Sequence, residues 1–248
     1  MKIAGTTALV TGGNRGIGEG FVEELLAQDA ARVYVGSRDV TEAEAVAALD
    51  PDRVVVVELD ITEQVQVDTA AALANDIRLL VNNAGVFHNT TLLGADDMTA
   101  MESEITVNYL GTMRMCRAFA PIIEANGGGA IVNVLSAGGI VAVPDMGGYS
   151  PSKFAMRAAS DCLRAELAPK GVHVAALIVG SVETRMAEHV VGVHKEPPRA
   201  IAKAGLVAAK HSISEHDTDP FAIGVRAQLH RDPSGLAAVL AASVQQGG

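Results

Sequence analysis

The sequence contains few aromatic residues, no tryptophan and only two cysteines. Aromatic residues make up 3% of the 248 residues, so Ala, Val, Leu and Ile must form most of the core, as suits buried parallel strands and closely packed helices. Cys116 and Cys162 fall in segments with a helical pattern and have no metal-ligand spacing. We therefore expect two buried thiols in a reducing compartment, without a disulfide framework or a metal site.

Basic clusters and long apolar runs are also missing. The net charge is −10 and no run of Lys or Arg stands against it, which disfavours nucleic acid and anionic membrane surfaces as partners. No uninterrupted apolar run approaches the ~20 residues that a membrane-spanning helix needs. The N-terminal segment MKIAGTTALV lacks the pattern of a signal peptide. We expect a cytoplasmic protein.

The segments that are present alternate between two kinds of pattern. Short, near-continuous apolar runs are typical of parallel strands buried on both faces, and the stretches between them have a helical pattern. This alternation predicts an α/β fold with a doubly wound parallel sheet (a Rossmann fold) in a single domain over residues 1–248. The predicted strands are Thr6–Thr11, Arg32–Gly36, Val54–Leu59, Leu79–Asn82, Ala130–Leu135 and Val172–Val179, and the predicted helices are Gly16–Gln28, Glu42–Leu49, Glu63–Asn75, Thr99–Ala125 and Gly148–Ala168.

The last quarter of the chain has a less regular pattern. Residues 181–199 include Pro197 and Pro198 and are predicted to form a loop over a site. Beyond them the sequence predicts a helix over residues 200–210, a short strand within 211–216, and one or two helices over 221–242 with a break near Pro233.

A glycine-rich turn follows the first predicted strand directly. The segment TGGNRGIG, residues 11–18, opens into a helix. Glycine lets the backbone approach a ligand closely, and the N-terminus of the helix offers free N–H groups and a positive dipole end to a pyrophosphate. The spacing is TGxxxGxG, and its position in a βαβ pattern favours a dinucleotide site. The candidate residues are Gly12, Asn14, Arg15, Gly16, Ile17 and Gly18.

The end of the second predicted strand bears on the choice of dinucleotide. An NAD site usually places a carboxylate there to bind the ribose 2′-OH, whereas an NADP site uses Arg. Ser37 and Arg38 stand at this end, and both favour a 2′-phosphate, with Arg15 as a second positive charge. The next residue, Asp39, keeps NAD open as an alternative.

A tyrosine and a lysine four residues apart provide a candidate catalytic pair. Tyr149 and Lys153 occupy one face of a predicted helix. A nearby ammonium favours the phenolate and should lower the tyrosine pKa from its usual ~10. Ser136 ends a predicted strand, at the sheet edge where ligand sites of parallel sheets lie. The Ser136 hydroxyl could hold a carbonyl oxygen there while Tyr149 donates its proton.

Together these motifs resemble the short-chain dehydrogenase/reductase family of the TGxxxGxG / YxxxK type, over about residues 5 to 187. The resemblance implies hydride transfer between NADP(H) and a ketone, aldehyde or secondary alcohol. It assigns proton donation to Tyr149, carbonyl polarisation to Ser136, and to Lys153 the binding of the nicotinamide ribose. Asn108 would hold a water of a proton relay. Further cofactor contacts implied by the resemblance are Asp60, Ile61, Asn83, Ala84, Gly85, Gly180, Val182 and Thr184.

Two departures from the family pattern concern the later part of the chain. Val179 and Gly180 stand where the family usually has Pro-Gly, and the usual final strand with its DGG-like ending is missing, so residues 211–248 form an atypical tail. By resemblance, the long helices should pair across a two-fold axis, and we expect a homodimer or a homotetramer.

The substrate is predicted to be a small apolar carbonyl compound or alcohol. Residues 138–146 and 181–193 contribute apolar side chains and few fixed charges, which suits a ketone held by shape; these side chains are Ile140, Val141, Val143, Met146, Val182 and Met186. A 3-oxoacyl-thioester reductase is one alternative, although the net charge of −10 does not favour an acidic carrier. A non-catalytic NADP-binding regulator is the other.

Overall fold

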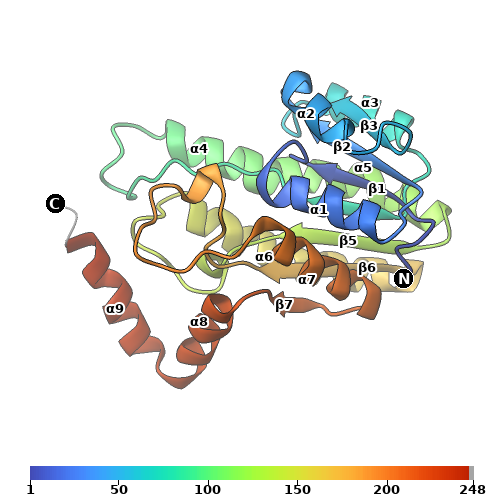
Figure 1. The fold of residues 1–248 in the computed structure, drawn as a ribbon. Coiled ribbons are helices and arrows are strands. Elements are labelled where there is room, and N and C mark those ends of the chain that lie inside the picture. The colour runs from blue at the N-terminus through green and yellow to red at the C-terminus, as the bar shows by residue number, and fades with distance from the viewer. Residues whose placement is uncertain (246–248) are drawn as a thin grey trace.

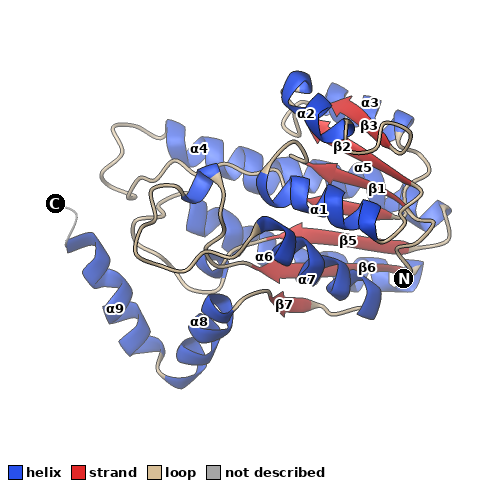
Figure 2. Cartoon of the chain, in the orientation of Figure 1, coloured by secondary structure: helices blue, strands red, loops and turns tan. Residues whose placement is uncertain are grey.

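Seven parallel strands form the centre of the computed structural model, which describes residues 1–245. Their order in the sheet is β3-β2-β1-β4-β5-β6-β7, and each neighbouring pair is parallel. The strands are β1 (Thr7–Thr11), β2 (Arg32–Ser37), β3 (Val54–Glu58), β4 (Leu79–Asn82), β5 (Gly129–Val134), β6 (Val172–Ile178) and β7 (Glu215–Asp217). The predicted doubly wound Rossmann fold is confirmed (Figures 1 and 2).

Helices cover both faces of this sheet. One face packs against α1, α2 and α7, with Phe21 fully buried beneath them, and the other packs against α3, α5 and α6, with Phe119 fully buried. Because both faces are covered, the strands carry almost only Val, Ile, Leu and Ala in their buried positions. The helices are α1 (Gly16–Ala27), α2 (Val40–Ala47), α3 (Gln64–Leu73), α5 (Thr112–Ala125), α6 (Tyr149–Leu167) and α7 (Pro198–His211).

The strand order reverses between β1 and β4. The chain proceeds from β1 toward β3 on one side and from β4 toward β7 on the other. In doubly wound sheets the loops diverge at this reversal and leave a crevice at the carboxyl ends of the strands. The glycine-rich turn follows β1, and the segment Asn83–Gly85 follows β4, so both motifs are placed at the crevice.

The predicted helix over residues 99–125 is present and contains one π-helical turn. It consists of α4 (Thr99–Ile105), a π-helical turn over Thr106–Gly111, and α5. Within this wider turn the Thr112 hydroxyl donates a 3.0 Å hydrogen bond to the Asn108 carbonyl. Gly111 packs so closely on Ile61 that a Cβ would lie 2.8 Å from its Cγ1. The predicted bounds of this helix are confirmed, and the sequence pattern gave no signal for the π-helical turn within it.

The C-terminal quarter contains a lid, a short strand and two helices. The lid, residues 181–197, is closed at its base by a bridge between Val182 and Glu196. The short strand predicted here is confirmed, since β7 pairs with β6, although the family's usual DGG-like ending is missing. This strand covers the end of the predicted range and runs past it to Asp217, because α7 runs to His211 and ends at Ser212 in the left-handed conformation, φ 54°. The last helices are α8 (Pro220–Arg231) and α9 (Pro233–Gln245), with the predicted break before Pro233 confirmed; Figure 1 shows α9 extending from the body beyond α8.

The two thiols lie in different environments. Cys116 is buried, whereas Cys162 is exposed, and neither forms a disulfide. The expectation that both are buried was wrong for Cys162, because its position on α6 faces away from the sheet core formed by Met156 and Leu163. Within residues 1–245 no helix is both long enough and apolar enough to cross a bilayer.

Candidate active site

A cavity of about 1250 Å³ lies at the carboxyl ends of the strands. It contacts the glycine-rich turn, the ends of β2, β4, β5 and β6, the start of α6 and the lid. Three of the four predicted catalytic residues line it, namely Ser136, Tyr149 and Lys153. Every predicted cofactor-binding residue except Gly18 also lines it: Gly12, Asn14, Arg15, Gly16, Ile17, Ser37, Arg38, Asp60, Ile61, Asn83, Ala84, Gly85, Gly180, Val182 and Thr184.

The glycine-rich turn is shaped by close backbone contacts. Gly16 begins α1 with φ +56°, a conformation that L side chains rarely adopt. Gly18 is buried, and a Cβ there would overlap the Gly12 carbonyl oxygen, so its place in the motif is explained by packing. The Asn83 side chain donates hydrogen bonds of 3.0 and 3.1 Å to the carbonyls of Thr11 and Gly12. The segment after β4 thus braces the turn after β1.

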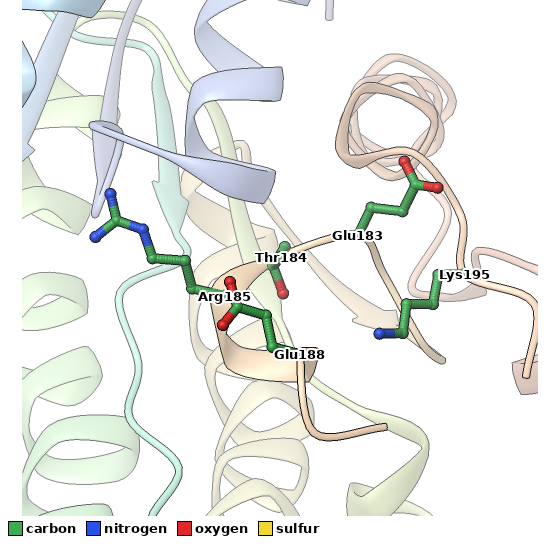
Figure 3. A pocket seen from close by; sticks show the side chains of 5 residues that line it. All are labelled: Glu183, Thr184, Arg185, Glu188 and Lys195. Carbon is green, nitrogen blue, oxygen red and sulfur yellow. The ribbon is translucent and has the colours of Figure 1, made fainter. Parts of the chain in front are cut away.

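Charged side chains gather at one end of the cavity. The carboxylate of Glu42 on α2 accepts from Arg15 at 2.8 Å and from Asn14 at 2.7 Å. It also accepts a 3.2 Å hydrogen bond from Arg185 of the lid. The hydrogen bond from Arg185, followed by the charges of Arg15 and Arg185, holds the pKa of Glu42 below its usual value. Figure 3 shows Arg185 directed away from Lys195, which lies on the other side of the lid segment.

The two charged residues that follow β2, Arg38 and Asp39, differ in their contacts. Asp39 is the N-cap of α2, and its side chain accepts a 3.1 Å hydrogen bond from the backbone N–H of Glu42. The backbone of Asp39 also bonds to the hydroxyl of Ser37 at both its N–H and its carbonyl. Arg38 is exposed and lines the cavity. One oxygen of the Asp39 carboxylate is therefore engaged in capping α2, although Asp39 lines the cavity beside Arg38.

Tyr149 and Lys153 occupy the opposite end of the cavity. The Lys153 Nζ lies 5.5 Å from the centroid of the Tyr149 ring and donates a 3.0 Å hydrogen bond to the Val134 carbonyl. Burial lowers the pKa of Lys153 to about 8. Burial also raises the pKa of Tyr149 to about 12, although a hydrogen bond with Ser136 opposes this rise. The expected lowering of the Tyr149 pKa by Lys153 was wrong for the protein alone, because burial raises this pKa most and the lowering that opposes it comes from Ser136.

The remaining polar contacts fix the side chains around this pair. Ser136 accepts a 3.1 Å hydrogen bond from the Gly138 N–H and so begins the 3-10 turn Ala137–Gly139. Phe87 contacts the Tyr149 ring edge to face, with centroids 5.1 Å apart, and meets His189 of the lid at 5.4 Å. The phenol is therefore held between the strand end and an aromatic contact with the lid.

The comparisons with known proteins decide the family. The family model described as short chain dehydrogenase matches residues 6–192, which is more than half of the chain. The chain belongs to this family. The 3-alpha-(or 20-beta)-hydroxysteroid dehydrogenase of Mycobacterium tuberculosis is 33% identical over 195 residues, 76% of this chain and 74% of the relative. Human 17-beta-hydroxysteroid dehydrogenase type 1 is 32% identical over 206 residues, 78% of this chain and 62% of the relative.

Solved structures agree with the fold. A short chain dehydrogenase from Burkholderia cenocepacia, in complex with NADP, superposes with a TM-score of 0.90 at 40% identity, covering 97% of this chain and 99% of that one. The 3-ketoacyl-(acyl-carrier-protein) reductase from Brucella melitensis, complexed with NADH, gives a TM-score of 0.81 at 26% identity, covering 87% of this chain and 96% of that one.

Asn108 of this short chain dehydrogenase does not line the cavity. It is 1% exposed, and its carboxamide accepts from the Val86 N–H at 2.8 Å. The same carboxamide donates to the Val86 carbonyl at 2.9 Å and to the Ser152 hydroxyl at 3.0 Å. Both ends of the side chain are thus engaged in holding the segment after β4 against α6. Its predicted place in a proton relay stays a prediction.

Asp219 is a site residue that sequence reasoning missed. It is 4% exposed, caps α8, and accepts a 2.7 Å hydrogen bond from the Gly180 N–H. A Cβ at Gly180 would collide with this carboxylate. The turn after β6, which lacks the family's proline, is thereby held by the tail. The segment Asp219-Pro220 was a local signal for a helix cap, but no sequence spacing relates it to Gly180.

The apolar wall of the cavity comes from several distant segments. Val141, Val143, Met146, Val182 and Met186 line it as predicted. Ile140 does not, because it is 4% exposed within the core on the α6 side of the sheet. Val190 and Val193, within the predicted segment 181–193, also line the cavity. Sequence reasoning missed other apolar residues of the wall, for which only the tertiary fold supplies the signal; they are Phe87, Phe221, Val225 and Leu240.

Proposed function

We propose that this short chain dehydrogenase is an NADP(H)-dependent carbonyl reductase that acts on an apolar ketone. The observation that carries the proposal is the placement of Ser136, Tyr149 and Lys153 on one wall of a cavity whose other end carries Arg15 and Arg38. One end offers a proton donor to a carbonyl oxygen, and the other offers guanidinium groups to a phosphate.

The residues around the cavity suit NADP. The free N–H groups at the start of α1 and the turn at Gly12 would hold the pyrophosphate. Arg38, with Arg15, would bind the 2′-phosphate, while Asp39, which also lines the cavity, caps α2 with one carboxylate oxygen. Ser181 has a buried hydroxyl with no hydrogen-bond partner among residues 1–245 and lines the cavity beside Gly180, so it is available to the nicotinamide end, together with Thr184. The NADP bound to the Burkholderia relative supports this assignment.

The reduction needs a hydride and a proton at the carbonyl group. NADPH, when bound, supplies the hydride. The protein's own part is to hold the carbonyl oxygen near the Ser136 hydroxyl and to donate the Tyr149 proton to it. Lys153 stabilises the phenolate that remains, because its ammonium lies 5.5 Å from the ring centroid. Oxidation of an alcohol runs the same transfers in reverse.

The apolar wall supports a ketone held mainly by shape. Val141, Met146 and Met186 surround the space beyond Tyr149, and Phe221 and Leu240 extend it toward the tail. Such a lining binds apolar groups and leaves the carbonyl oxygen as the group that is hydrogen-bonded. The hydroxysteroid dehydrogenases among the relatives make steroid ketones a sensible part of a substrate panel.

A panel of carbonyl compounds tests the proposal. Fluorescence titration measures NADPH binding, and loss of NADPH absorbance measures turnover with aryl ketones, steroid ketones, sugars, keto acids and a 3-oxoacyl thioester. We expect turnover with the apolar ketones. Preference for sugars or keto acids would refute the substrate class, and turnover confined to the thioester would favour a 3-oxoacyl-thioester reductase. Binding without any turnover would favour a regulator.

We also propose that the protein forms at least a homodimer. Leu110 in the π-helical turn and Phe154 on α6 are 42% and 38% exposed, and apolar side chains of this size favour burial against a partner. Static light scattering at micromolar concentration measures the mass. A monomeric mass would contradict this proposal without affecting the proposed activity.

A further inference from the structure

Glu104 on α4 is a buried carboxylate for which the proposed reaction has no use. It is 1% exposed. One carboxylate oxygen accepts a 2.8 Å hydrogen bond from the His88 backbone N–H. The other, Oε2, is buried and has no hydrogen-bond partner among residues 1–245. A buried carboxylate with incomplete hydrogen bonding costs free energy, and such groups gather at functional sites.

The position of Glu104 brings its charge to the start of the catalytic helix. Helix α4 packs against α6, and Gly148 directly precedes Tyr149. A Cβ on Gly148 would lie 2.5 Å from the Glu104 Oε2, so a glycine is required for the carboxylate to come this close. The charge of Glu104 raises the pKa of Tyr149, in addition to the larger effect of burial.

We propose that Glu104 is a positioning residue whose negative charge keeps Tyr149 protonated, so that carbonyl reduction extends to higher pH. The proposal rests on the proposed function. Reduction adds a hydride to the carbonyl carbon and the phenol proton to its oxygen, and it leaves a phenolate. Oxidation begins from that phenolate, which takes the proton of the alcohol. A fixed negative charge disfavours the phenolate and shifts both processes to higher pH.

Charges from the other elements around Tyr149 act beside Glu104. Lys153 on the same helix opposes it, because an ammonium 5.5 Å from the ring favours the phenolate. His88, after β4, lines the same cavity and bonds to Ser103 at 2.9 Å. His189 of the lid is separated from Tyr149 by the ring of Phe87. The two charges with opposite effects on the ionisation of Tyr149 are therefore those of Glu104 and Lys153.

The substitution Glu104→Gln tests the proposal, because glutamine keeps the length and the acceptor for His88 while removing the charge. The measurement is kcat/KM against pH in both directions. We expect the high-pH fall of reduction and the low-pH rise of oxidation each to move about 0.5–1 pH unit lower. Glu104→Asp, which restores a charge, should move both limbs back toward wild type. If Glu104→Gln folds and neither the high-pH fall of reduction nor the low-pH rise of oxidation moves, the proposal is overturned.

Glu24→Gln is the matched control. Glu24 is a buried carboxylate, 8% exposed, that bonds to Gln28 and Arg199 on the far side of α1. Its neutralisation should leave both pH limbs in place. If Glu104→Gln does not fold, Glu104→Met provides a second neutral variant, for which the same shift is expected and an unmoved limb is equally decisive.

A direct titration separates this inference from the proposed function. Phenolate absorbance, with Tyr149→Phe as the blank, reports the ionisation of Tyr149 whether or not a substrate is known. A lower Tyr149 pKa in Glu104→Gln would support the role of Glu104 even if no ketone in the panel is reduced. An unchanged pKa would overturn that role even if ketones are reduced.

Discussion

The two ends of the cavity differ in how far water reaches their charged groups. At the Tyr149 end, Lys153 is 6% exposed and Glu104 is 1% exposed. At the Arg38 end, the side chains of Arg15 and Arg185 are 50% and 66% exposed. Water and salt screen charges at the exposed end, whereas a buried charge acts on its neighbours with little screening. One residue can therefore decide the chemistry at the first end, while several share the binding at the second.

The polar contacts of the two ends of the cavity also differ in their exposure to water. Glu42 gathers Arg15, Arg185 and Asn14 in exposed or part-buried contacts, and each such pair contributes little to stability. The buried end uses hydrogen bonds to backbone groups, as between Lys153 and the Val134 carbonyl. Substitutions at the buried end should therefore have the larger effects.

Removal of the proton donor should have the largest effect. Tyr149→Phe deletes one hydroxyl and leaves the packing of the ring against Phe87. We expect turnover to fall by roughly 10²–10⁴-fold, as is usual for loss of a general acid, with little change in NADPH affinity. Steady-state kinetics and fluorescence titration measure the two quantities. If the variant keeps more than about a tenth of wild-type turnover, Tyr149 is not the acid.

Removal of the Asp219 carboxylate, which holds the turn after β6, should have the second largest effect. Asp219→Ala removes acceptors from the N–H groups of Gly180 and Ala222. A lost buried cap of this kind destabilises by about 1–3 kcal/mol, and we expect kcat/KM to fall by about tenfold as Gly180 loses its support. Urea denaturation and kinetics measure the two effects. Asp232→Ala is the control, since Asp232 accepts from the Gly235 N–H in an exposed position; equal losses in both variants would argue against a specific role of Asp219.

At the exposed end, Arg38→Ala should reduce cofactor discrimination. A charge-assisted hydrogen bond to the 2′-phosphate contributes about 1–3 kcal/mol when partly exposed, or roughly 5- to 150-fold. Wild type should prefer NADPH by at least about tenfold in kcat/KM, and the variant should lose most of this preference by weaker use of NADPH. Ser37→Asp should shift the preference further toward NADH, because the new carboxylate repels the 2′-phosphate of NADPH. Equal use of both cofactors by wild type would contradict the assignment of Arg38.

The smallest effect is expected at Glu42. Glu42→Gln removes a charge that competes with phosphate for Arg15 and Arg185. Because these pairs are exposed, NADPH should bind more tightly by less than about fivefold, and the gain should shrink as salt is added. Glu44→Gln, on the same helix and exposed, controls for net charge. Weaker NADPH binding by Glu42→Gln would mean that the contacts of Glu42 with Arg15 and Arg185 support the site.

The parts that sequence predicted well depend on local patterns. The turn at Gly12–Gly18, the strand ends at Ser37 and Ser136, and the pair Tyr149 and Lys153 each follow from adjacent residues and from the rule that parallel strands end at one edge. Their convergence on one cavity is then a consequence of the topology. This is why nearly every predicted cofactor residue lines the cavity.

The parts that were missed depend on contacts between distant segments. Asp219 meets Gly180 across 39 positions, and Glu104 meets the His88 backbone across 16. The rise in the Tyr149 pKa comes from burial, which requires the assembled fold. Short elements were also difficult, because the three-residue strand β7 is defined by pairing with β6 and has little pattern of its own.

The π-helical turn over Thr106–Gly111 has a consequence for insertions and deletions. An α-helix turns by about 100° per residue, and a π-helical turn accommodates one additional residue without rotating the helical residues beyond it. Deleting one residue here would therefore restore a regular α-helix and leave Glu104 in place relative to α5, whereas inserting one further residue would rotate it by about that angle. Since Glu104 and Asn108 bond to the backbone of His88 and Val86 in the segment after β4, such an insertion would disturb these contacts. Homologous chains should therefore accept loss of the π-helical turn more readily than a further insertion in this helix.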